Sequence, residues 1–175
     1  QDEHGWQDRR GEEVIPGQNV SYLQRLAELA GDVPRARMAA GFMGITLFWR
    51  QMQGELWPPG ARAAFISDAF VAWLTGASPC TDPSNADGSG LFDAQARRWN
   101  APLIARLGLP EMILPPVRPA PAVAGGLRAE LAAAAGLCAG VPVSVSIGDN
   151  QASFLGSVAD APQSVLLNIG TGGQL

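Results

Sequence analysis

The sequence predicts an α/β fold, and alternating strand and helix patterns near its end carry that prediction. Residues 141–147 are β-branched at alternate positions and lead through a glycine to Asp149, which is the pattern of a strand that ends in a turn. Apolar residues then recur at helical spacing from Gln151 to Val158. A second β-branched run, Ser164 to Ile169, ends in the glycine-rich turn Gly170-Thr171-Gly172-Gly173. The order strand, helix, strand is typical of an α/β domain.

The upstream residues predict five helices by apolar residues at helical spacing, over 20–30, 45–52, 69–74, 101–107 and 127–135. We expect a short strand over 63–66, after which Ser67-Asp68 would cap the next helix. The polar stretch 81–90 has the composition of a loop. The stretch 110–121 contains five prolines, so we expect a rigid, extended connector on the surface.

Composition narrows the class of protein. With 175 residues, 47% hydrophobic content and a mean hydropathy of +0.07, the chain can form one domain with a sizeable core. It has no apolar run long enough to cross a membrane. The net charge of −4 and the scattered arginines argue against nucleic acid as a partner. Cys80 and Cys138 have no partner motif, so we expect both to be buried and reduced in the cytoplasm, with a disulfide between them as the less favoured alternative.

Asp149 and the turn Gly170-Thr171-Gly172 are the candidate chemical groups, because each directly follows a predicted strand and they lie about twenty residues apart. A carboxylate can deprotonate an acceptor hydroxyl, and a glycine turn can hold phosphate oxygens, so the pair suggests phosphoryl transfer. Two simpler interpretations remain open. Asp149 could serve only as a helix N-cap, and the glycines could form only a tight turn.

Several other sites are excluded or disfavoured. The dinucleotide fingerprint needs a small sixth residue, where this chain has Leu175, and the Walker loop needs a lysine, which the chain lacks. A zinc site would have to join Cys80, Cys138 and His4, so we predict no metal site made by the protein alone.

Residues 5–11 gather an aromatic ring, an acid and two arginines within a few positions, including Trp6 and Asp8. Such a segment is usually a solvated turn. A sugar pocket also uses a flat apolar face beside groups that fix hydroxyl orientation. The segment is a candidate sugar site on this ground alone.

Eight motifs in the same order make the chain resemble the FGGY carbohydrate kinases over nearly all of its length. They are Trp6-Gln7-Asp8-x-Arg10, Gly41-Phe42 with Thr46-Leu47-Phe48-Trp49, Asp82-x-Ser84-Asn85-Ala86 with Phe92-Asp93, Arg97-Arg98-Trp99-Asn100, Leu114-Pro115, Pro121 to Gly125, Gly148-Asp149-x-Gln151-Ala152-Ser153, and Leu167-Asn168-Ile169-x-Thr171. Among the branches of this family, the sedoheptulokinases are the most similar.

The resemblance implies an actin-like (ribonuclease H-like) ATPase fold of two domains, with sugar and ATP in the cleft between them. Residues 1–155 would form the later part of the first domain, and 156–175 the start of the second. We therefore expect a fragment of a longer protein, truncated at both ends, that is inactive alone and does not bind ATP tightly.

The resemblance also assigns roles to residues. Asp149 would be the general base, and Gly170, Thr171 and Gly172 would hold the phosphates of ATP, which is used with Mg²⁺. The sugar would contact Trp6, Asp8 and Asn150. The implied partners are a small sugar and ATP in the cytoplasm, with no nucleic acid and no membrane. Whether the protein forms a homodimer is left open.

Thr46 bears on the substrate. Glycerol and xylulose kinases usually carry a lysine there, whereas threonine favours the sedoheptulokinase branch, which would convert sedoheptulose to sedoheptulose 7-phosphate. Asn150 and Gly170 instead look like the generic kinases. Alternatives are therefore a kinase for another ketose, polyol or sugar acid, such as xylulose, ribulose, glycerol or gluconate, or an inactive sugar-binding relative.

Overall fold

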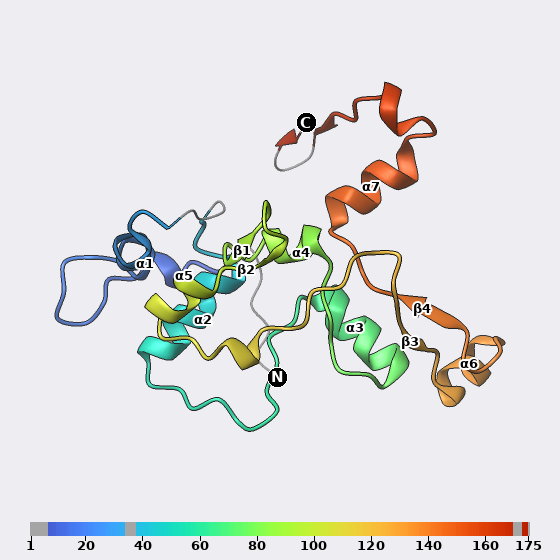
Figure 1. Cartoon of the computed structure of the whole chain (residues 1–175), viewed down its shortest axis with the longest axis horizontal. Helices are drawn as coiled ribbons and strands as arrows, with labels where there is room; N and C mark the ends of the chain where they lie inside the picture. The colour runs from blue at the N-terminus through green and yellow to red at the C-terminus, as the bar shows by residue number, and fades with distance from the viewer. Residues whose placement is uncertain (1–6, 34–37, 170–172, 175) are drawn as a thin grey trace.

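A computed structural model of the chain describes residues 7–33, 38–169 and 173–174, and it alternates short helices with two-stranded sheets (Figure 1). The helical elements are η1 (Arg10–Glu12), α1 (Tyr22–Ala30), α2 (Met43–Met52), α3 (Ile66–Thr75), α4 (Pro83–Asp87), α5 (Ala101–Arg106), η2 (Glu111–Ile113), α6 (Ala129–Ala135), α7 (Asp149–Ser157) and η3 (Ala161–Gln163). The strands are β1 (Phe92–Asp93), β2 (Arg98–Trp99), β3 (Val123–Gly126), β4 (Pro142–Ser144), β5 (Asn168–Ile169) and β6 (Gly173–Gln174).

Each sheet among the described residues is an antiparallel pair: β1 with β2, β3 with β4, and β5 with β6. The predicted strand over 141–147 is present only as the three residues of β4, which pair with β3. The backbone from Val145 to Gly148 continues outside regular structure until α7 begins. Asp149 therefore follows a short antiparallel strand and an irregular segment, rather than the end of a long strand.

One hydrophobic core lies in the first two thirds of the chain, where α1, α2, α5 and η2 meet; in Figure 1, α1, α2 and α5 form one group. Its most buried side chains come from these helices and from the residue before β1: Leu26, Ile45, Phe48, Leu91, Leu103, Ile104 and Ile113. Ser21 caps α1 in a capping box with Gln24, and Gly31 ends it, as the sequence predicts. Phe48 is a core aromatic, also as predicted.

Three expectations from the sequence are wrong. The stretch 81–90 contains helix α4, because Asp82 accepts a hydrogen bond from the Ser84 N–H as an N-cap and Pro83 occupies the first turn. Residues 63–66 are not a strand, and α3 already begins at Ile66 with Phe65 as its N-cap. Asp68 is consequently a buried residue inside α3 rather than part of its cap.

The proline-rich connector is also less exposed than expected. Ile113 and Leu114 are buried in the core, and Pro115 is fully buried. Cys80 is buried and free, as predicted, whereas Cys138 is exposed, because it lies in the turn after α6. None of the helices in the described ranges is long and apolar enough to span a membrane.

Candidate active site

Asp149 is the first residue of α7, and its side chain is exposed. Its Oδ1 accepts a hydrogen bond from the N–H of Asn150 at 2.7 Å, and Asn150 is exposed as well. The N-cap of α7 is Gly148, so Asp149 does not have the N-cap role that the sequence left open. Among the described residues no arginine pairs with Asp149, which disfavours a purely structural ion pair. An exposed carboxylate can accept a proton from a bound hydroxyl.

Helix α4 lies against the segment that leads to Asp149. The N–H of Gly148, directly before Asp149, donates to Ser84 Oγ at 2.9 Å. Two residues earlier, Ser146 Oγ donates to Asp68 Oδ1 of α3 at 2.5 Å and accepts from Asn85 Nδ2 of α4 at 3.2 Å. Two helices that are more than sixty residues away in the sequence therefore contact this segment through side-chain hydrogen bonds.

Asp68 is fully buried in this cluster. Its Oδ2 and the hydroxyl of Thr81 are buried, and neither has a partner of good hydrogen-bond geometry within the described residues. Desolvation by burial raises the pKa of the Asp68 carboxyl, and the hydrogen bond from Ser146 opposes that rise. Asp68 is thus a polar contact between α3 and the segment before Asp149, and it has no exposed atom with which to contact a substrate.

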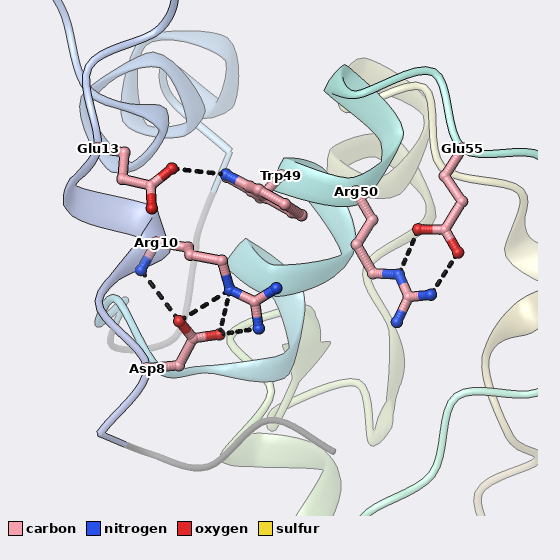
Figure 2. Close-up of polar contacts among 6 residues, drawn as sticks. All are labelled: Asp8, Arg10, Glu13, Trp49, Arg50 and Glu55. Carbon is pink, nitrogen blue, oxygen red and sulfur yellow. Dashed lines mark hydrogen bonds and ion pairs between the residues drawn. The ribbon is translucent and has the colours of Figure 1, made fainter. Parts of the chain in front are cut away.

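The candidate sugar residue Asp8 forms the second polar centre (Figure 2). Its Oδ1 accepts from the backbone N–H of Arg10 at 3.0 Å, which closes a local turn into η1. The Arg10 guanidinium contacts both carboxylate oxygens, with Nε 3.1 Å from each and a terminal nitrogen 2.9 Å from Oδ2. The side chain of Asp8 is only 10% exposed, so this bidentate contact fixes the direction of a mostly buried carboxylate.

Trp49 of α2 supports Arg10 from the other side. The guanidinium carbon lies 4.8 Å from the centre of the Trp49 ring, and this is a cation–π contact. Figure 2 draws both side chains. The indole Nε1 donates to Glu13 Oε2 at 3.1 Å, which fixes the orientation of the ring. A chain of contacts thus runs from Glu13 through Trp49 of α2 and then Arg10 to the carboxylate of Asp8.

A hollow of about 290 Å³ opens beside Asp8. Residues 7–9 and Glu12 line it together with residues 39–41, so Asp8 of the first motif and Gly41 of the second line the same hollow. A larger open cleft of about 670 Å³ lies elsewhere, lined by residues that include Asp32, Trp99 and Arg106, and it contains none of the predicted site residues. We assign the smaller hollow to the candidate site because of its chemistry.

The predicted site is thus divided. Asp149 and Asn150 lie together at the start of α7, whereas Asp8 lies beside α2, and in Figure 1 α7 lies beyond α4 from α1 and α2. Trp6 and the turn Gly170, Thr171 and Gly172 lie outside the described residues. Sequence reasoning did not select Arg10 and Ser84 as site residues. The spacing Asp8-x-Arg10 was a signal for Arg10, but nothing local pointed to the contact of Ser84.

The chain is similar to known carbohydrate kinases over the region that contains these motifs. Residues 6–156 match the family model described as the FGGY family of carbohydrate kinases, N-terminal domain. Glycerol kinase 2 of Sulfolobus acidocaldarius is 29% identical over 95% of the chain and 33% of its own length, and glycerol kinase of Bordetella pertussis is 32% identical over 95% of the chain and 32% of its own length.

A solved structure is similar as well. The crystal structure of a xylulose kinase from Brucella ovis superposes with a TM-score of 0.68 at 30% identity, and covers 87% of this chain and 30% of that one. The chain spans about a third of the length of the curated relatives that it matches.

Proposed function

The chain belongs to the FGGY family of carbohydrate kinases, and from this premise we propose that it supplies the general base for ATP-dependent phosphorylation of a sugar or polyol hydroxyl. Its fold is the actin-like α/β ATPase fold of the family's N-terminal domain. Residues 1–155 would be the later part of that domain and residues 156–175 the start of the next. The family match over residues 6–156 supports this division.

The observation that carries the proposal is the position of Asp149, an exposed carboxylate at the first residue of α7. Asp149 accepts the proton of the acceptor hydroxyl as that oxygen attacks the γ-phosphorus of ATP; the bond between that phosphorus and the β,γ-bridging oxygen breaks, and ADP leaves. General-base assistance contributes roughly 10²- to 10⁴-fold to such a step. The remaining acceleration comes from positioning the reactants and stabilising the phosphoryl charge.

Asp8 and Asn150 are proposed to contact the acceptor. Asp8 lines the adjoining hollow, and a carboxylate can accept a hydrogen bond from a sugar hydroxyl bound there. Asn150 can donate and accept next to the base. Because Asp8 and α7 lie apart in this chain, the proposal requires both to approach one acceptor in the full-length enzyme.

ATP is proposed to bind through Gly170, Thr171 and Gly172, and Trp6 to contact the sugar; the support for these roles is the motif pattern alone. Magnesium would enter bound to ATP and neutralise phosphate charge. Among the described residues no three Asp, Glu, His or Cys side chains gather as metal ligands, so none is assigned to the ion.

The identity of the acceptor sugar or polyol is the next part of the proposal. The residue type at Thr46 favours sedoheptulose, but its side chain is buried in α2, with 9% exposed, so it offers a bound sugar little surface. The similar proteins named above are glycerol and xylulose kinases. We therefore propose the class of small ketoses and polyols, with sedoheptulose, xylulose and glycerol as the first acceptors to compare.

The test is ADP release by the full-length protein with ATP and Mg²⁺, in the presence of sedoheptulose, xylulose, ribulose, glycerol or gluconate. Turnover that depends on one acceptor supports the kinase function and identifies the substrate. A folded protein that binds a sugar but transfers no phosphate to any acceptor would instead be an inactive sugar-binding relative.

A further inference from the structure

The segment from Val145 to Gly148 leads directly to Asp149, and it is held from three directions. The N–H of Val145 donates to Ala122 O at 2.9 Å, next to β3. The hydroxyl of Ser146 joins the buried cluster of Asp68 and Asn85. The N–H of Gly148 reaches Ser84 Oγ, which is the last of these contacts before Asp149.

Ser84 is oriented for this contact by Asp82. The Ser84 hydroxyl donates its only proton to Asp82 Oδ1 at 2.5 Å, so its lone pairs face outward and accept from Gly148 at 2.9 Å. Asp82 is 8% exposed, and its Oδ2 accepts from the N–H of Ala120 at 3.0 Å. A chain of hydrogen bonds therefore runs from Ala120 through a nearly buried carboxylate and a hydroxyl to the backbone before Asp149.

Gly148 leaves little room for a side chain at this contact. A Cβ atom at this position would lie 2.3 Å from Gln151 Oε1 and 3.3 Å from Ser84 Oγ. Gly148 is also the N-cap of α7, and it has no side chain with which to cap the helix. The Ser84 hydroxyl thus contacts the backbone at the point where α7 and Asp149 begin.

We propose that Ser84 is a positioning residue for Asp149. Its hydroxyl is oriented by Asp82 and accepts from the N–H of Gly148, and in this way it fixes the position of the Asp149 carboxylate. The proposal rests on the base role proposed above for Asp149. Ser84 acts through the backbone and does not need to touch the substrate. Loss of the hydroxyl leaves the contacts of Val145 and Ser146 in place, so the segment stays attached to the domain while Asp149 loses its nearest support.

A small displacement of a catalytic group strongly lowers the reaction rate. A misplacement of about 1 Å can lower the rate around 10²-fold. We expect Ser84→Ala to lower kcat about 10- to 100-fold in the full-length enzyme, with KM values for acceptor and ATP within about twofold of wild type. Ser84→Thr keeps the hydroxyl and should restore most of kcat. Ser78→Ala, at an exposed serine in the loop after α3, is the matched control.

A double-mutant cycle separates positioning from general stability. If Ser84 acts through Asp149, adding Ser84→Ala to Asp149→Asn should cause little further loss, because the base that it positions is already absent. Hydrogen exchange of the peptide spanning 145–151 gives a readout without catalysis. We expect faster exchange there in Ser84→Ala than in wild type or in Ser78→Ala.

Several results would overturn the proposal: a Ser84→Ala enzyme as active as the Ser78→Ala control, the same loss of kcat in the Asp149→Asn background as in wild type, or unchanged exchange at 145–151. In each case the kinase function would stand, since wild-type turnover measures it separately. A wild-type protein that phosphorylates no acceptor, or an Asp149→Asn enzyme with normal turnover, would remove the proposed function, and the positioning role would fall with it.

Discussion

The guanidinium of Arg10 lies between the carboxylate of Asp8 and the ring of Trp49, in contact with both. It binds the two oxygens of Asp8 at 2.9–3.1 Å and lies 4.8 Å from the centre of the indole ring. Asp8 is therefore presented to the hollow by a cation that is itself packed on α2. The direction of this carboxylate depends on the shape of the cation as well as on its charge.

Arg10→Lys should weaken acceptor binding, because lysine keeps the charge but loses the planar, bidentate contact and the stacking on Trp49. Hydrogen bonds to charged groups contribute about 1.5–3 kcal/mol, so we expect the KM for the acceptor to rise about tenfold or more. The KM for ATP should change little. Steady-state kinetics of the full-length enzyme measures both.

Arg25→Lys is the control for this substitution, because within the described ranges the ion pair of Arg25 is an exposed one with Glu28 on α1. Its kinetics should match wild type. An Arg10→Lys enzyme with an unchanged acceptor KM would show that Asp8 does not contact the acceptor.

Asp149→Asn should lower kcat by roughly 10²- to 10⁴-fold, because an amide keeps the shape of the side chain but cannot accept a proton. Sugar affinity, measured by calorimetry, should stay near that of wild type. The side chain is exposed at a helix start, so the thermal midpoint should also change little. Asp160→Asn, at an exposed aspartate after α7, is the control, and it should be as active as wild type. Near-normal turnover in Asp149→Asn would rule out the base role.

The elements that the sequence predicted well are those that local signals define. Helix α1 has its capping box at Ser21 and its terminating glycine at Gly31, and both act within a few residues. The start of α4 also carried a local signal, Asp82 followed by Pro83, but the polar composition of 81–90 favoured a loop. Composition was the weaker guide, because a short helix can consist of polar residues when a good N-cap starts it.

The contacts that hold the candidate site could not be predicted from local sequence. Ser84 meets Gly148 across 64 residues, and Asp68 meets Ser146 across 78. Ser67-Asp68 has the composition of a helix cap, but α3 begins at Ile66, which turns Asp68 inward. A helix start three residues earlier than expected thus converts an expected surface cap into a buried polar contact.

Asp68 predicts a pH dependence of stability. Its pKa is raised in the folded state, so the folded protein holds this proton more tightly than the unfolded chain does. The stabilising contribution is complete below the ordinary pKa near 3.8 and is lost as pH rises through the higher folded value. Asp68→Asn removes the titration, so its thermal midpoint relative to wild type should improve as the pH is raised from about 4 to 7.

Thermal unfolding of both proteins at each pH gives this difference. The effects of other titrating groups cancel, because the two proteins share them. Asp68→Leu is the comparison that removes the polar contacts as well, and it should be destabilised at every pH because Ser146 and Asn85 lose a partner. A difference between Asp68→Asn and wild type that stays constant with pH would contradict the raised pKa.

Two helical glycines predict opposite effects of one substitution. Gly44 in α2 lies against the backbone of Ser89, where an added Cβ would be 2.6 Å from the carbonyl oxygen that accepts the N–H of Gly44. Backbone cannot move aside as a side chain can, so Gly44→Ala should destabilise the domain by about 1–3 kcal/mol, as overpacking does.

Gly156 in α7 has open space around its Cβ position. Gly156→Ala should stabilise by about 0.5–1 kcal/mol, because alanine has the higher helix propensity. Denaturant unfolding of the two variants compares them directly, and a Gly44→Ala protein as stable as wild type would mean that α2 does not pack on Ser89 as described.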